Sequence, residues 1–461
     1  MQPGVMVLLS YTLRAPAFSH SLADFESRRL IMALPIHRTS SGSKNFERRV
    51  SRTAGETEPV RGPAEAGHVS LPTVRLFRTV NEIEGLRTFW SSWRGCRDSD
   101  LDLVLAICRS TPGIAHPIAL VVYRAEQPSA GLLGWIEKRP VPFRVGFFNL
   151  ISPTLDVLTF SQGAFRGEES RESCDLLSRE ALKTLQSGEG DLVLFDHLGT
   201  ESAMLQSLRR ASGPLSREWF SSIRPHWVRK IPDSLEQLRA SFSVSERKRF
   251  RQIAKKLSAD FQGRVELTRC DAPSQMEETL VDVEHIAART WQREISRGYN
   301  TDPSHADYLR VEAELGYLRV YVLHLAGRPC AFWIGAVHRQ TFYTDFVGYD
   351  PEYARYSVGT YLLSRVLEQA CSEGVQVFDF GFTDDEYKRR FGNLMKPETS
   401  LHIFAPGLQG AALNFMRMCT VTLNGVVKAL LECAKLTQLA KTWRRRASRN
   451  NHDQSVRTAL N

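Results

Sequence analysis

The order of predicted secondary structure is the same in both halves of this 461-residue chain, and this repeat constrains the fold more than any other feature. Short apolar or alternating segments predict three strands, then an amphipathic helix, then a buried strand with an aspartate (Asp196 or Asp379) near its end. In the first half these segments are 117–123, 131–137, 143–151, 172–185 and 191–196. In the second half they are 318–325, 330–337, 341–349, 357–371 and 375–380.

Two interpretations fit this repeat. An internal duplication predicts an α+β fold with two tandem β-β-β-α-β domains, whose mixed central sheets are flanked by helices. The alternative is two unrelated α+β domains that share a common motif. We predict domains at 71–225 and 226–406, then a C-terminal helix and basic tail at 407–461. Residues 1–70 lack apolar periodicity, so we expect a disordered or mis-assigned extension there.

The formal net charge of +9 is confined to the ends of the chain. Residues 1–70 hold nine Lys or Arg and six Asp or Glu, whereas residues 435–461 hold seven and one. The body between them, 71–434, carries 44 basic and 44 acidic side chains. Bulk charge therefore argues against a body that binds polyanions, and no strong nucleic-acid signal is present.

The eight cysteines are not spaced like metal ligands, because no Cys-x-x-Cys occurs and no pair stands beside suitably spaced histidines. We therefore expect no metal site and a reducing, cytoplasmic location. No apolar run reaches the ~18 residues that a spanning helix needs.

The C-terminal stretch 408–449 supports two interpretations. Apolar residues recur close to a helical period after Asn424, and a cationic side and end follow from Lys428, Lys435, Lys441 and Arg444 to Arg446. Such a helix either docks on the second domain or lies on an anionic membrane surface, which would place the protein at the periphery of the inner membrane.

The segment from Tyr349 to Asp379 has the order strand, loop, helix, strand. Ser357 can cap the helix, and Gly359 lets a ligand approach the backbone closely. The first N–H groups of a helix lack intrahelical partners, and the helix dipole favours an anion there. The junction is therefore suited to a phosphate or pyrophosphate held by main-chain amides. The alternative is an ordinary helix start capped by Ser357.

This order, with the residues around it, resembles the acyl-CoA cradle of the GNAT acetyltransferases. The resemblance rests on Gly348-Tyr349-Asp350, Ser357-Val358-Gly359-Thr360, Phe378-Asp379-Phe380-Gly381 and Tyr387-Lys388 with Phe391-Gly392. These motifs are most similar to the CelD-like branch, which is linked to cellulose and exopolysaccharide production. They are also similar to the Fem-type transferases, which have two GNAT-like halves. The resemblance covers residues 226–405, and 74–225 by repeat order alone.

The resemblance implies acetyl-CoA or another acyl-CoA as co-substrate and direct transfer of the acyl group to a nitrogen or oxygen nucleophile. It implies cofactor contacts for Val347, Gly348, Tyr349, Ser357, Val358, Gly359 and Thr360. A main-chain N–H near Val347 to Tyr349 would polarise the thioester carbonyl. The loop departs from the general family pattern in either of two alignments, and we call it degenerate. With Gly359 as the middle glycine, Tyr356 and Tyr361 replace the outer residues of the pattern. With Arg355 at the basic position, Val358 stands where a glycine is expected.

Catalytic roles are implied for three side chains. Tyr387 is the candidate acid for the leaving thiolate, and Asp345 and Asp379 are candidate bases. Strand alternation predicts that Thr341, Tyr343, Asp345, Val347 and Tyr349 share one face. Asp345 is otherwise a solvated strand residue, and Asp379 otherwise caps the next turn. Lys388 is either a substrate ligand or a surface lysine.

The predicted helix 245–261 carries Arg247, Arg251 and Lys255 on one face. Phe250, Ile253, Ala254 and Leu257 form the opposite apolar stripe. The basic face is either solvated or binds an anionic ligand such as a CoA phosphate, a nucleotide-sugar or tRNA, so Arg247 and Arg251 are candidate ligand-binding residues.

Three functions therefore follow as hypotheses. The first is an acyl-CoA-dependent N- or O-acyltransferase that acts on a small-molecule or sugar acceptor in envelope or exopolysaccharide biosynthesis. The second is a non-catalytic interaction module among polysaccharide-synthesis proteins, motivated by the degenerate loop. The third is an aminoacyl-tRNA-dependent transferase of the Fem type, motivated by the basic helix.

Overall fold

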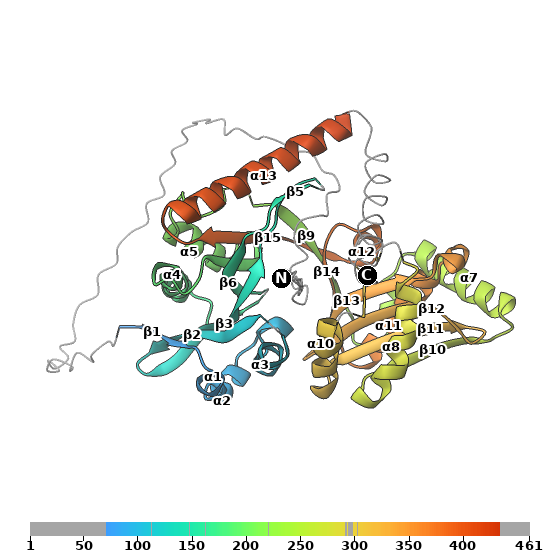
Figure 1. Cartoon of the computed structure of the whole chain (residues 1–461). Helices are drawn as coiled ribbons and strands as arrows, with labels where there is room; N and C mark the ends of the chain where they lie inside the picture. The colour runs from blue at the N-terminus through green and yellow to red at the C-terminus, as the bar shows by residue number, and fades with distance from the viewer. Residues whose placement is uncertain are drawn as a thin grey trace, which may run out of the picture.

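The computed structural model describes residues 71–433 of the chain. The residues within this range that it does not describe are Pro112, Phe147, Gln162, Phe220, 291–292, 294–297 and Asp302. The predicted extension 1–70 and the basic tail beyond Cys433 lie outside the described residues. Figure 1 shows the two halves of the chain side by side, with a long C-terminal helix across one end.

The N-terminal half is built on a sheet with the order β1-β2-β3-β6-β8. All neighbours are antiparallel except β6 and β8, which are parallel. Its strands are β1 (Thr73–Phe77), β2 (Ile114–Arg124), β3 (Gln127–Pro140), β6 (Thr154–Phe160) and β8 (Leu192–Gly199), with a short β7 (Phe165–Gly167) on β3. Its helices are α1 (Val80–Glu84), α2 (Arg87–Ser92), η1 (Arg97–Ser99), α3 (Leu101–Ser110) and α4 (Arg171–Gln186).

The C-terminal half repeats this topology in the order β10-β11-β12-β13-β14, again with one parallel pair, β13 and β14. Its strands are β10 (Val265–Cys270), β11 (Leu318–Leu325), β12 (Arg328–His338), β13 (Thr341–Tyr349) and β14 (Val377–Phe382). Its helices are α6 (Leu235–Ala240), α7 (Val244–Asp260), α8 (Pro273–Ala287), α10 (Pro303–Glu314), η2 (Pro351–Tyr356) and α11 (Val358–Ser372). The tandem mixed α+β arrangement predicted from the repeat is thereby confirmed.

The two halves exchange their sixth strands. After β8 and α5 (Ala203–Ala211), β9 (Ile223–Lys230) pairs with β14 of the C-terminal half. After β14 and α12 (Glu386–Phe391), β15 (Leu394–Phe404) pairs with β8 of the N-terminal half. Because β9 and β15 also pair with each other, the halves share one 13-stranded sheet. The predicted domain boundary between residues 225 and 226 falls inside β9.

The predicted third strand of the first half, 143–151, is wrong. Residues Phe143–Val145 (β4) and Phe148–Ile151 (β5) form a separate two-stranded hairpin. The chain turns at Gly146, whose φ of +59° favours glycine, so one apolar run becomes two short strands. The third strand of the main sheet is β6, which follows the hairpin.

A 26-residue helix, α13 (Leu408–Cys433), follows the sheet. Its Leu413 and Met416 pack on the N-terminal core, and Arg417 ion-pairs with buried Glu218 at 2.5 Å. In the part of the chain that the structure describes, no helix combines the length and hydropathy needed to cross a bilayer.

The strand exchange has a testable consequence for stability. Leu401 of β15 is fully buried in the core of the N-terminal half. In the sequence, however, β15 follows the strands of the C-terminal half. We expect Leu401→Ala to lower the free energy of unfolding by ~2–5 kcal/mol in urea titrations. Amide hydrogen exchange should accelerate in β6 and β8.

The control is Leu394→Ala, on the same strand but 39% exposed, which should cost less than about 1 kcal/mol. Faster exchange confined to β10–β13 after Leu401→Ala would contradict the exchange of strands.

Candidate active site

Strands β13 and β14 pair over a short distance and then separate. Their parallel register covers only Thr341–Tyr343 and Val377–Asp379. Beyond it β13 continues six residues to Tyr349, while β14 keeps its pairing with β9. In the N-terminal half, the equivalent pairing of β6 with β8 reaches Phe160, the last residue of β6. The opening between the two parallel strands is therefore specific to the C-terminal half.

Asp345 is the extra residue of a β-bulge in β13. Thr344 pairs with Gly335 and Phe346 with Ile334, so Asp345 has no partner of its own on β12. A bulge shifts the alternation by one residue, and the predicted single face is therefore wrong. Phe342 and Val347 both pack in the core under α11, whereas Tyr343 and Asp345 face Arg97 of the N-terminal half.

The end of β13 lies beside the start of α11. A Cβ added at Gly359 would stand 3.5 Å from the Tyr349 ring, which is ordinary van der Waals contact. Ser357 occupies the N-cap position in a left-handed conformation (φ 53°), and its side chain makes no capping hydrogen bond. The N-terminus of α4, the equivalent helix, is capped by the Ser170 hydroxyl. Of the two equivalent helices, only α11 starts without a side-chain cap.

Gly348 has a packing role. A Cβ at this position would lie 2.5 Å from the Phe332 ring and 3.0 Å from Thr290. The absence of a side chain therefore lets β13 approach the layer of α8, independently of any ligand.

The loop between β13 and α11 is anchored by a residue that sequence reasoning missed. Asp350 is 2% exposed and accepts hydrogen bonds from the Glu352 N–H at 3.0 Å and from Arg289 at 2.8 Å. Asp350 is part of a motif that carries the family resemblance, but its contact with Arg289, which follows α8, has no local sequence signal.

The basic helix α7 lies against the same loop. Lys256 donates to the Arg355 carbonyl at 3.2 Å, and its ammonium lies over the Tyr356 ring. Ile253 and Leu257 are buried, which confirms the predicted apolar stripe. Arg247 and Arg251 remain accessible on the other side of the helix.

Asp345 belongs to a buried ionic cluster that joins the two halves. Both of its oxygens accept hydrogen bonds from Arg97 of η1 at 2.9 Å. Arg97 also contacts Glu312 at 3.1 Å and Asp98 at 3.4 Å, so three carboxylates share one guanidinium. Burial raises the pKa of the Glu312 carboxyl to about 8, against the opposing effect of the Arg97 guanidinium. Tyr308 donates to Glu312 at 2.8 Å.

Asp379 lies in a second buried group at the seam between the halves. His226 of β9 contacts Asp379 through Nε2 at 2.6 Å and Glu398 of β15 through Nδ1 at 2.8 Å. Despite desolvation, these two carboxylates raise the pKa of His226 to about 9, so the ring is an imidazolium at neutral pH. Asp379 also accepts the Gly381 N–H at 2.7 Å, so it caps the following turn as well.

Tyr387 and Lys388 lie on α12, beside the end of β14. The Tyr387 ring packs edge-on against Trp333 and Phe380, and burial raises the pKa of its phenol well above the ordinary value. The Lys388 side chain is largely buried, and its ammonium donates to the Phe382 carbonyl. Lys388 thus fastens α12 to the end of β14.

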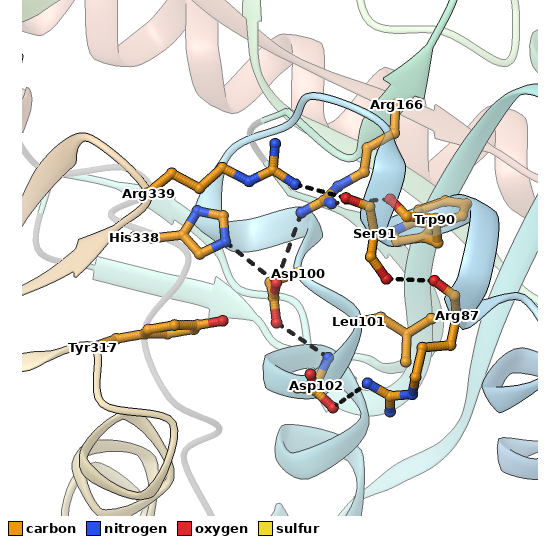
Figure 2. Close-up of a pocket in the computed structure, with 10 residues that line it drawn as sticks. All are labelled: Arg87, Trp90, Ser91, Asp100, Leu101, Asp102, Arg166, Tyr317, His338 and Arg339. Atoms are coloured by element: carbon orange, nitrogen blue, oxygen red, sulfur yellow. Dashed lines mark hydrogen bonds and ion pairs between the residues drawn. The ribbon is translucent and has the colours of Figure 1, made fainter.

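A separate cavity of about 280 Å³ lies between the N-terminal half and the β12–β13 turn (Figure 2). Arg166 donates to the carbonyls of Trp90 and Cys96 at 3.3 and 3.2 Å, and Arg339 donates to that of Trp93 at 2.9 Å. Both arginines satisfy carbonyls at and beyond the end of α2, and Arg339, which belongs to the C-terminal half, ties the two halves together. None of the side chains predicted for the site lines this cavity.

Residues 245–389 match the family model described as an acetyltransferase (GNAT) domain. This segment contains α7, the bulged β13, the α11 junction and all the residues predicted for cofactor, catalysis and substrate. Over these residues the chain is therefore similar to a GNAT acetyltransferase domain. No curated protein sequence matches the chain.

Solved structures with a similar fold include FemX, which is 11% identical, with a TM-score of 0.51 over 70% of this chain and 96% of FemX. Similarity extends to L-PGS from Bacillus licheniformis, at 14% identity and a TM-score of 0.44 over 73% of this chain and 96% of that one. A tandem GNAT protein from the clavulanic acid biosynthesis pathway is 11% identical, with a TM-score of 0.43 over 73% of this chain and 100% of that protein.

The raised pKa of His226 makes stability depend on pH. The ordinary value is 6.5 and the folded value about 9, so the folded state binds more protons between them. The stabilisation is fully present below about pH 6.5 and is lost as the pH rises through 9; for this buried group it is on the order of 3 kcal/mol. We expect urea unfolding to show that the difference in free energy of unfolding between the wild type and His226→Gln shrinks as the pH rises from about 6.5 to 9.

The matched control is His285→Gln, which removes an exposed histidine on α8. Its stability should run parallel to that of the wild type at every pH. Identical pH slopes for the wild type and His226→Gln would show that His226 is not held as an imidazolium.

Proposed function

We propose that the C-terminal half binds an acyl-CoA and transfers its acyl group to a nitrogen or oxygen nucleophile. The observation that carries the proposal is the junction of β13 and α11, where a bulged, partly unpaired strand ends beside an uncapped helix start. The GNAT family match over residues 245–389 supports it.

The residues at this junction fit a pyrophosphate. The first amides of α11, from Val358, Gly359 and Thr360, have no side-chain cap to compete with a ligand, and a helix N-terminus favours an anion. Helix α7 contacts the loop through Lys256 and carries Arg247 and Arg251, which are suited to phosphate groups. The exposed main chain of β13 near Val347 and Tyr349 would hold the rest of the acyl-CoA.

Asp345 and Asp379 are the carboxylates nearest to the opening between β13 and β14, and one of them would accept the proton that the acceptor loses. As the bond from the acyl carbon to nitrogen or oxygen forms, the carbon–sulfur bond breaks and the thiolate takes up a proton. The raised pKa keeps Tyr387 protonated but makes it a weak acid. Hydrogen-bond donation to the sulfur is therefore the role that its burial favours.

Binding can be tested at Gly359. We expect Gly359→Ala to fold like the wild type and to keep measurable acetyl-CoA binding, because its Cβ would meet only ordinary contact with Tyr349. Gly359→Glu places a carboxylate at the helix start and should weaken binding at least ~10-fold in isothermal titration calorimetry.

Equal urea midpoints for the two variants would show that the loss is local. If neither the wild type nor Gly359→Ala releases heat with any acyl-CoA, the acyltransferase proposal fails.

Catalysis can be tested at Asp345. We expect Asp345→Asn to lower kcat by about 10²-fold or more in an assay of thiol release with a panel of amines, amino sugars and hydroxyl acceptors, with the KM for acyl-CoA unchanged. The control is Asp307→Asn, which alters a surface carboxylate paired with Arg310 at 2.8 Å. If kcat is unchanged in Asp345→Asn but falls in Asp379→Asn, then Asp379 is the residue that accepts the proton.

The acceptor is proposed from motif resemblance alone: a sugar-type or amino group in envelope or exopolysaccharide metabolism. A deletion strain complemented with Asp345→Asn would test this. Unaltered acyl content of the cell's polysaccharides would rule out that acceptor class, while acyl-CoA binding would remain testable in vitro.

Two other functions make different predictions. A Fem-type transferase is favoured by the fold likeness to FemX and by the basic face of α7, and it requires a salt-sensitive gel shift with aminoacyl-tRNA. An interaction module is favoured by the degenerate loop. If the protein is such a module, cells that carry the folded double variant Tyr387→Phe, Asp345→Asn should still produce exopolysaccharide.

A further inference from the structure

Helix α13 has one face that packs on the protein and an opposite face that is apolar and exposed. The packed face includes Leu413, Arg417, Thr420 and Asn424. The opposite face is one continuous stripe at spacings of three and four residues: Leu408, Ala412, Phe415, Cys419, Leu423, Val426 and Leu430. Every member of this outer stripe is exposed, including Phe415 at 68%.

The outer stripe is unusual for a helix that borders solvent, where the face away from the core is normally polar. It runs over 23 residues, from Leu408 to Leu430, or about 33 Å at the rise of an α-helix. An exposed apolar strip of this extent is typical of an interaction surface. Figure 1 shows α13 lying along the outer edge of the molecule, away from the C-terminal half's sheet.

The end of α13 projects beyond its support. Asn424 makes the last anchoring contacts, donating to the Arg144 carbonyl at 2.8 Å and accepting from the Gly146 N–H at 2.7 Å. The described side chains from Gly425 to Leu430 are all exposed. The β4–β5 hairpin that Asn424 holds carries further exposed apolar residues, Phe148 and Leu150.

The charge of the neighbouring sequence indicates which kind of partner covers the outer stripe. Residues 435–461, which follow α13 directly, contain seven Lys or Arg and one Asp. The described part of α13 offers no pattern of opposite charges flanking the stripe, which is what pairing with a second helix would use. An apolar stripe that continues into a strongly basic segment matches an anionic bilayer, where tails accept the apolar side chains and headgroups attract the cations.

We propose that the outer stripe of α13 and the basic segment 435–461 dock the protein on an anionic membrane surface. The helix lies in the interface and does not span it. The body of the protein, with no net charge over 71–434, contributes little to the attraction.

The test is flotation of the full-length protein with phosphatidylcholine vesicles, with and without one quarter phosphatidylglycerol. At low salt, the wild type should float with the anionic vesicles. With the neutral vesicles it should remain in the vesicle-free fraction. Raising the salt should release it, because exposed charges are screened. Phe415→Ser with Leu423→Ser should reduce the bound fraction at least ~10-fold, and R444E/R445E/R446E should abolish it.

The matched control is Val281→Ser, which removes an equally exposed apolar side chain from α8 and should bind like the wild type. Equal urea midpoints will show that all variants fold. A wild type that stays in the vesicle-free fraction, or floats equally with neutral vesicles, overturns the proposal. So does a dimer in sedimentation equilibrium that Phe415→Ser dissociates, because the stripe is then covered by a second copy.

Discussion

Main-chain hydrogen bonding between β8, β15, β9 and β14 is the constraint on which the rest of the structure depends. Each half would otherwise end in an unpaired strand edge, which is a liability for a sheet protein. Exchange of the sixth strands removes both edges and makes the halves one continuous sheet. It also places His226 of β9 between Asp379 of β14 and Glu398 of β15. The seam therefore determines both stability and the surroundings of a candidate catalytic carboxylate.

The halves share a topology, but only one combines a bulged strand with a helix start that lacks a side-chain cap. In the C-terminal half, the bulge at Asp345 reorients the end of β13, and α11 starts without a side-chain cap. In the N-terminal half, β6 pairs with β8 to its end, β7 returns to β3, and Ser170 caps α4. The N-terminal half instead contributes to its neighbour, because Arg97 neutralises Asp345 from across the interface.

Part of the site could be read from the sequence. The strand, loop and helix around Gly359 and the apolar stripe of α7 follow from patterns within a few residues. The side of β13 on which Asp345 lies could not be predicted, because a bulge changes the alternation of side chains without leaving a signal in the composition. Its Arg97 partner lies 248 residues away and the His226 partner of Asp379 lies 153 residues away. For Lys388 the sequence left a substrate ligand and a surface lysine as alternatives, and its buried contact with the Phe382 carbonyl has no local sequence signal.

The sequence by itself determined the order of elements and the tandem α+β class, because periodicity and helix-start chemistry act over short distances along the chain. It also determined that positive charge gathers at the ends. Only the tertiary structure decided the exchange of β9 and β15, because a strand's propensity does not specify its partner. Only the tertiary structure decided which face of α13 is covered. Arg417 interrupts the apolar pattern of this helix in the sequence, yet its ion pair with Glu218 is buried, and Phe415 points outward.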